Sequence, residues 1–157
     1  MMRKLLFLLA FAFAAMLQAA DFVTESRWIT ASEGDVNAQN TWIAFRKDIT
    51  LGSIPMKVEA SIAAASKYWL WINGEMVVFE GQLKRGPTPK DTYYDKVDIT
   101  PFLKKGNNEV AVLLWYFGKS GFSHNSSGKS GLLFSAQAIG LYSDSQWMSR
   151  IHPAYGT

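Results

Sequence analysis

Apolar and polar side chains alternate along most of the chain after its first twenty residues. Apolar side chains recur at every second position over residues 41–49 and, more clearly, over residues 56–64. A period of two residues is that of a half-buried β-strand, whose successive side chains point to opposite faces. Further strands are expected at residues 68–72, 76–79, 93–97, 109–117, 132–139 and 146–151. The pattern therefore predicts a chain of seven or eight short strands.

Residues that favour turns separate these segments. Asn73-Gly74 joins residues 68–72 to residues 76–79, and this pair favours a type I′ hairpin because both of its residues need positive φ. Residues 86–89 read Gly-Pro-Thr-Pro and predict a surface loop, since proline cannot donate to a sheet. Residues 109–117 are apolar on both faces, which predicts a central strand covered on both sides.

One helical turn is expected within residues 98–106. Thr100 is the predicted N-cap, Pro101 suits the first helical position, and Gly106 would end the turn in the left-handed conformation. No longer helical pattern occurs after residue 20. Many short strands with regular turns are typical of an antiparallel β-sandwich, which is the predicted all-β fold.

The first twenty residues have the layout of a secretory signal peptide. Arg3 and Lys4 precede the apolar residues 5–17, and small residues follow. The apolar segment is shorter than the roughly 20 residues that span a membrane. We expect processing that leaves Ala20 or Asp21 as the new N-terminus, and a periplasmic or extracellular protein. The alternatives are a membrane anchor or a buried N-terminal helix.

Composition excludes several classes of function. Lys and Arg number 16 against 13 Asp and Glu, and without Arg3 and Lys4 the balance is 14 to 13, or +1. No basic run longer than two residues remains after the signal segment, so a nucleic-acid partner is not supported. The chain has no cysteine and two histidines, which excludes disulfides, thiolate zinc sites and His-rich metal sites. No cofactor is expected. Oxygen ligands are compatible with calcium, but no calcium-binding loop motif supports it.

Two short motifs resemble catalytic or nucleotide-binding sequences without completing them. Gly118-Lys119-Ser120 and Gly128-Lys129-Ser130 both lack the glycine that a phosphate-binding loop needs five residues earlier. Residues 118–131 therefore predict a Gly/Ser-rich loop between two strands. His124 in this loop has no sequence signature of a catalytic triad, and an ordinary exposed loop histidine is the favoured interpretation. No catalytic residue and no metal ligand is assigned.

The tryptophans near the predicted hairpin are more informative. Strand alternation puts Tyr68, Leu70 and Ile72 on one face, with Trp69 and Trp71 on the other. Three interpretations remain open for the two tryptophans. They form a sugar-stacking platform, they form a docking surface for another domain, or the strand is buried on both faces and they belong to the core.

An ordered set of motifs resembles the N-terminal β-sandwich domain of bacterial alpha-L-rhamnosidase-type glycoside hydrolases. The resemblance spans residues 27–147 and rests on W-I-A-F-R-K-D at residues 42–48, Y-W-L-W-I-N-G at 68–74, G-P-T-P at 86–89, Y-Y-D-K-V-D-I-T at 93–100, L-K-K-G-N at 103–107 and V-A-V-L-L-W at 110–115. It implies a jelly-roll domain of the galactose-binding type, followed in such enzymes by a catalytic helical barrel that holds the acid and base carboxylates. Residues 143–147 resemble the closing strand of that domain.

The expected organisation follows from this resemblance. Residues 1–20 form the signal peptide, residues 21–144 the β-sandwich accessory domain, and residues 145–157 the last strand and the start of a linker to a catalytic domain absent from this chain. The implied function is that of a non-catalytic module in a secreted alpha-L-rhamnosidase-like hydrolase, which supports the catalytic domain and contacts rhamnose-containing glycans. The alternative is a free-standing secreted carbohydrate-binding or structural interaction module. No activity is expected from this chain alone. The candidate residues for carbohydrate binding or docking are Trp69, Trp71, Tyr93, Tyr94 and His124.

Overall fold

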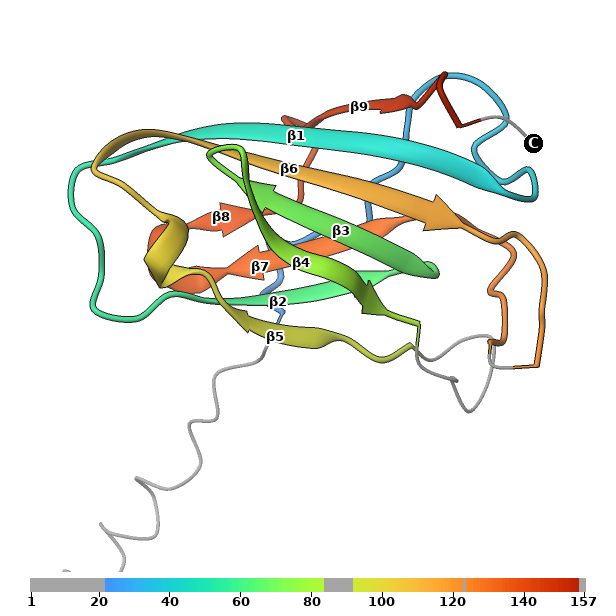
Figure 1. Cartoon of the computed structure of the whole chain (residues 1–157), viewed down its shortest axis with the longest axis horizontal. Helices are drawn as coiled ribbons and strands as arrows, with labels where there is room; N and C mark the ends of the chain where they lie inside the picture. Colours follow the sequence, from blue (N-terminus) through green and yellow to red (C-terminus); the bar gives the residue numbers. More distant parts are fainter. Residues whose placement is uncertain (1–21, 84–91, 123, 156–157) are drawn as a thin grey trace, which may run out of the picture.

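Two antiparallel β-sheets face each other in the computed structural model, which describes residues 22–83, 92–122 and 124–155 (Figure 1). The five-stranded sheet has the order β4-β3-β6-β1-β9, and the four-stranded sheet the order β5-β2-β7-β8. The strands are β1 (Thr41–Leu51), β2 (Glu59–Ala64), β3 (Lys67–Ile72), β4 (Glu75–Gln82), β5 (Asp95–Asp98), β6 (Gly106–Tyr116), β7 (Leu132–Ala136), β8 (Leu141–Tyr142) and β9 (Met148–Ile151). The predicted antiparallel β-sandwich is confirmed.

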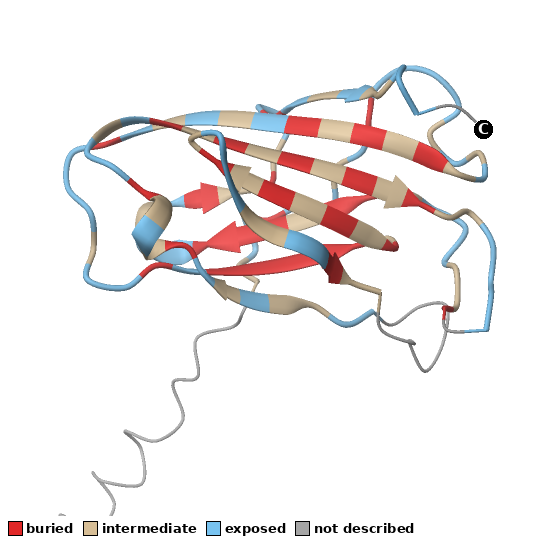
Figure 2. Cartoon of the chain, in the orientation of Figure 1, coloured by how far each residue is buried: buried red, intermediate tan, exposed pale blue. Residues whose placement is uncertain are grey.

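The core lies between the two sheets and is built by strand alternation. β1 pairs with β6 in unbroken register from Thr41↔Tyr116 to Leu51↔Gly106. Buried and half-buried residues alternate along β3, most of β6 and the first five residues of β1, as Figure 2 shows. The largest fully buried side chains include Tyr68, Phe45 and Phe134. Each strand of the five-stranded sheet therefore presents its alternate side chains on an outer face that the sandwich itself leaves uncovered.

The predicted hairpin is confirmed at Asn73-Gly74, whose φ angles are 54° and 80°. The Asn73 side chain also joins three chain segments. Its Nδ2 donates to the carbonyl of Phe102 at 2.8 Å and to Oδ1 of Asn108 at 2.9 Å, and its Oδ1 accepts from the Glu109 N–H at 3.2 Å. Asparagine therefore supplies hydrogen bonds here as well as tolerance of positive φ.

The helical turn is present, but two of its predicted residues act differently. A 3₁₀ helix, η1, spans Thr100–Phe102 with proline in its first turn, and Ile99 rather than Thr100 is its N-cap. Thr100 Oγ1 instead accepts from the Val58 N–H at 2.7 Å, which ties the turn to the chain ahead of β2. Gly106 has φ 91° but opens β6, because the helix has already ended in extended backbone at Leu103. The N-cap and stop assignments were wrong because these groups serve the adjacent strands.

Several strand ends differ from the alternation pattern. β2 begins at Glu59, and Met56 lies outside it and is 99% exposed. The predicted strand at residues 132–139 ends at Ala136 and continues as a second 3₁₀ helix, η2 (Gln137–Ile139). The two-residue β8 was not predicted, and the last strand begins one residue after Trp147, whose ring turns into the core. Among the described residues, no helix is long and apolar enough to cross a membrane. The predicted signal peptide and the loop at residues 86–89 lie outside the described residues.

Candidate functional site

Trp69 and Trp71 both lie on the outer face of the five-stranded sheet. Tyr68, Leu70 and Ile72 of the same strand are fully buried, whereas the two tryptophans are half-buried. The alternation predicted from the sequence is confirmed, and the interpretation of these tryptophans as core residues was wrong. The predicted double cover of residues 109–117 was also wrong. β6 is central, but Ala111, Leu113 and Trp115 on its outer side are only half-buried.

Trp42 is the centre of a cluster of stacked rings on this outer face. Its ring stacks on Trp115 of β6 with centroids 4.8 Å apart and an interplanar angle of 9°. It also stacks on Trp69 at 5.4 Å and on Tyr155, near the C-terminus, at 4.5 Å. We call these four residues, with Phe79 and Phe117, the outer aromatic cluster. Because the rings stack on one another, much of their flat surface is already in contact.

Phe79 and Phe117 extend the cluster at its margins. Phe79 of β4 meets Trp69 edge-on at 6.4 Å and is 71% exposed. Phe117 meets Trp115 edge-on at 4.6 Å, and Trp115 Nε1 donates to Asn40 Oδ1 at 2.6 Å, which fixes the indole. The cluster is thus a contiguous apolar surface whose rings are held by their neighbours.

His124 is joined to this cluster through Phe117, with the two rings 5.6 Å apart. It is buried, so the prediction of an exposed loop histidine was wrong. The loop folds back, and His124 Nε2 lies 3.4 Å from Oγ of the buried Ser66. Burial lowers the pKa of His124, which favours a neutral ring at pH 7. Ser66 Oγ accepts from the Phe117 N–H at 3.1 Å, so this pair supports the fold beside the cluster.

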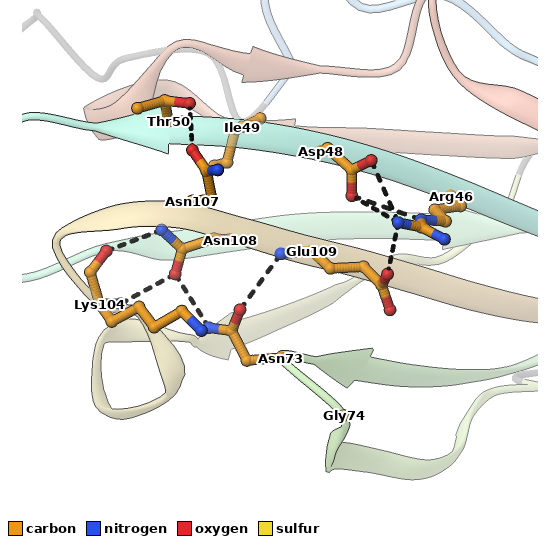
Figure 3. A pocket seen from close by; sticks show the side chains of 10 residues that line it. All are labelled: Arg46, Asp48, Ile49, Thr50, Asn73, Gly74, Lys104, Asn107, Asn108 and Glu109. Atoms are coloured by element: carbon orange, nitrogen blue, oxygen red, sulfur yellow. Dashed lines mark hydrogen bonds and ion pairs between the residues drawn. The ribbon is translucent and has the colours of Figure 1, made fainter.

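A polar hollow of about 670 Å³ lies at the hairpin end of the same sheet (Figure 3). Its lining residues come from β1, the β3–β4 turn, the segment after η1 and β6, and they are Arg46, Asp48, Ile49, Thr50, Asn73, Gly74, Lys104, Asn107, Asn108 and Glu109. Arg46 Nη2 lies 2.8 Å from Glu109 Oε2 and 3.2 Å from Asp48 Oδ2. One guanidinium therefore holds two carboxylates that β1 and β6 place side by side.

Hydrogen bonds connect the residues at the base of the polar hollow. Asn108 is 2% exposed, and its Oδ1 accepts from the Lys104 N–H at 2.8 Å. Its Nδ2 donates to the carbonyls of Lys104 at 2.7 Å and of Gly106 at 3.0 Å. Thr50 Oγ1 donates to Asn107 Oδ1 at 2.8 Å. The polar atoms of the buried Asn108 side chain therefore have hydrogen-bond partners within the protein. Arg46, Asp48 and Glu109 lie beside this hydrogen-bonded base.

Tyr93 and Tyr94 do not join either feature. Both immediately precede β5, which is one of the two edge strands of the four-stranded sheet. Tyr93 is 46% exposed, and the Tyr94 ring meets Phe22 edge-on at 5.3 Å. Of the five predicted site residues, Trp69 belongs to the outer aromatic cluster, and His124 only borders it through Phe117. Trp71 lies on the same sheet face, and the two tyrosines lie apart from all three.

Sequence reasoning missed the residues that complete the cluster and the hollow. Trp42 alternates in the sequence with Ile43 and Phe45, which are buried. Strand alternation alone therefore predicts that Trp42 points to the opposite, outer face. Its pairing with Trp115 depends on the register between β1 and β6, and no local pattern gives that register. Within the described part of the chain, no three His, Cys, Asp or Glu side chains gather closely enough to hold a metal ion.

No family model and no curated protein matches the chain. Solved structures do. The GH78 family rhamnosidase of Bacillus sp. GL1 matches with a TM-score of 0.69 and 30% identity, over 80% of this chain and 13% of that one. The alpha-L-rhamnosidase of Aspergillus terreus matches with a TM-score of 0.61 and 26% identity, over 83% of this chain and 17% of that one. A lectin from Pleurotus ostreatus shares the fold, with a TM-score of 0.54 and 21% identity over 81% of this chain and 35% of that one.

The resemblance to one domain of alpha-L-rhamnosidases is therefore confirmed. This chain spans less than a fifth of the length of the two enzymes. The match therefore concerns one domain of each enzyme and not the whole enzyme.

Proposed function

We propose that this chain serves as a non-catalytic β-sandwich module of an exported alpha-L-rhamnosidase-type glycoside hydrolase, in which it supports a separate catalytic domain. The observation that carries the proposal is the match in both sequence and fold to one part of the Bacillus sp. GL1 rhamnosidase, which covers 80% of this chain and 13% of that one. A module of this kind contributes a surface, and the outer aromatic cluster is the candidate surface.

The geometry of the cluster favours docking to another protein domain over sugar stacking by the same rings. Trp42 has Trp115, Trp69 and Tyr155 in stacking contact, which leaves little flat area for a ligand. The rings therefore present edges and apolar area over a broad surface. The ion pair of Arg46 with Glu109 and that of Lys67 with Glu80 lie on neighbouring strands of the same sheet. Aromatic centres with polar rims are typical of protein interfaces.

The alternative is a free-standing secreted module that binds carbohydrate or acts as a structural interaction protein. One observation favours carbohydrate binding: the polar hollow lies on the same sheet face as Trp71, so hydrogen-bonding groups and an aromatic ring are close together. This arrangement is compatible with the docking role, because the cluster and the hollow use different residues.

A domain exchange tests the proposed role. In the Bacillus sp. GL1 rhamnosidase, the matched region would be replaced by residues 22–155 of this chain, and in a second protein it would be deleted. We expect the exchanged enzyme to hydrolyse an aryl alpha-L-rhamnoside and the deletion to be insoluble or inactive. This chain alone should release no rhamnose from the same substrate. An activity of the isolated chain that survives repurification and disappears on a single Asp or Glu substitution would contradict the proposal, as would an exchanged enzyme no better than the deletion.

Export is a separate expectation. The basic, apolar and small residues at positions 1–20 should direct secretion, after which the chain begins at Ala20 or Asp21. N-terminal sequencing of protein from the cell envelope or the medium measures this directly. Recovery of the chain only from the cytosol, with Met1 intact, would show that the segment is not a signal peptide.

A further inference from the structure

Three residues form a row across the outer face of the five-stranded sheet. In the strand registers, Ala111 of β6 pairs with Trp71 of β3 on one side and with Arg46 of β1 on the other. Adjacent strands lie about 4.8 Å apart, so the Trp71 and Arg46 backbones are separated by about 10 Å. Only the methyl group of Ala111 lies between the Trp71 and Arg46 positions in this row. We call these three residues the trough, which has an aromatic side chain at one end and a charged side chain at the other.

Trp71 differs from the other tryptophans of this face. Trp42, Trp69 and Trp115 stack on one another, whereas Trp71 makes no ring contact with another aromatic side chain of residues 22–83, 92–122 and 124–155. It is half-buried and has Met76 of β4 as its other strand partner. No other described ring stacks on its indole. An indole face of this kind suits the apolar C–H side of a sugar ring.

At the charged end of the trough, Arg46 offers a hydrogen-bond donor and its ion-pair partner Glu109 offers an acceptor. Arg46 Nε and Nη2 are held by Asp48 at 3.2–3.3 Å, and Nη2 is held by Glu109 Oε2 at 2.8 Å. Arg46 Nη1 and Glu109 Oε1 make no hydrogen bond to the part of the chain that the structure describes. A hydroxyl group both accepts and donates, so two neighbouring hydroxyls can satisfy both atoms.

The charges of the polar hollow favour a neutral ligand. Arg46 and Lys104 contribute two positive charges, and Asp48 and Glu109 contribute two negative charges, so the sum is zero. An anionic ligand would have to compete with the two carboxylates for Arg46, and a cation would have to compete with Arg46 for the carboxylates. A polyhydroxy ligand gains hydrogen bonds without breaking either ion pair.

We propose that this trough binds a neutral pyranose sugar, with its apolar face on Trp71 above Ala111 and two adjacent hydroxyls on Arg46 Nη1 and Glu109 Oε1. The inference rests on the proposed function and names a ligand class for the module. It also separates the two predicted tryptophans: Trp69 belongs to the outer aromatic cluster, and Trp71 belongs to the sugar site.

Calorimetric titration of the purified protein with L-rhamnose, D-galactose and D-galacturonate tests the site. We expect saturable binding of at least one neutral sugar with a Kd of about 1–10 mM, as befits one stacked ring and two hydrogen bonds on an open surface. Trp71→Ala should raise that Kd about tenfold or more, because it removes the stacking surface. Glu109→Gln should raise it about fivefold, because it replaces a charged acceptor by a weaker neutral one. Trp71→Phe should retain part of the affinity. Trp28→Ala is the matched control, because Trp28 is 52% exposed and lines neither the trough nor the hollow, and its Kd should change less than twofold.

The thermal midpoint of each variant shows whether it is folded, and Trp71→Phe keeps the test valid if Trp71→Ala unfolds. No saturation by either neutral sugar up to about 100 mM, which corresponds to negligible affinity, would overturn the proposal. So would binding of galacturonate alone, or a Kd that Trp71→Phe and Glu109→Gln both leave unchanged. These outcomes leave the domain exchange unaffected, because that experiment depends on the outer aromatic cluster and not on the trough.

Discussion

Gly81→Ala is expected to lower the free energy of unfolding by about 3 kcal/mol or more, because it overpacks the core where no atom can yield easily. Gly81 of β4 pairs directly with Tyr68 of β3. A Cβ at position 81 would lie 2.3 Å from Tyr68 Cζ and 2.7 Å from its hydroxyl oxygen. Glycine is required here for a close approach between two strands, and not for a positive φ.

The Tyr68 ring cannot move away from the added methyl group without losing packing contacts and a hydrogen bond. It is fully buried, and its hydroxyl donates to Asp95 Oδ2 at 3.1 Å. Burial, followed by the charge of Asp95, raises the pKa of Tyr68, so the hydroxyl keeps its proton and remains a donor. The same carboxylate oxygen accepts from the Gln82 N–H at 2.7 Å. Moving the ring would therefore disturb β3, β4 and the start of β5 together.

Urea unfolding measures the effect, with Gly52→Ala as the control. A Cβ at Gly52 meets no atom within 4 Å, and its φ is not in the left-handed region, so the control should stay within about 0.5 kcal/mol of the parent protein. Equal unfolding midpoints for Gly81→Ala and Gly52→Ala would show that the β3–β4 contact adjusts at little cost.

The sequence predicted correctly two features that depend mainly on neighbouring residues, namely strand alternation and the hairpin turn. Alternation along residues 68–72 correctly separated the buried side chains from Trp69 and Trp71, because the strand period is a local property. Asn73-Gly74 correctly located a hairpin, because its requirement for positive φ is also local. The all-β class follows from the same two kinds of signal.

The candidate site could not be predicted in full because long-range pairing assembles it. Trp42 and Trp115 face each other only through the register of β1 with β6, and the same register brings Asp48 opposite Glu109. Thr100 had the residue type of an N-cap, but its hydroxyl found a partner in Val58, 42 residues away. Residue type restricts what a side chain can bind, and tertiary structure decides which partner it meets.

Trp42→Ala is expected to destabilise the protein by about 2–3 kcal/mol, although its side chain is only half-buried. Each aromatic pair contributes about 0.5–1.5 kcal/mol beyond area burial, and Trp42 has three stacked partners. Phe79→Ala is the matched control, because Phe79 lies on the same face, is 71% exposed and has one edge contact, at 6.4 Å from Trp69. The control should cost about 1 kcal/mol or less, as expected for the loss of one such pair at an exposed position.

The comparison bears directly on the proposed docking surface. A cluster whose rings hold one another is rigid before a partner arrives, so docking would lose little side-chain entropy. Urea unfolding of the two variants therefore tests whether the rings of the cluster stabilise one another. The exchanged rhamnosidase carrying Trp42→Ala tests whether the cluster docks against the catalytic domain. We expect that enzyme to lose thermal stability beyond the loss seen in the isolated chain, because the substitution would weaken the docking contacts as well as the contacts within the cluster. If Trp42→Ala costs no more than Phe79→Ala, the rings are independent surface residues, and the outer aromatic cluster is not a preassembled interface.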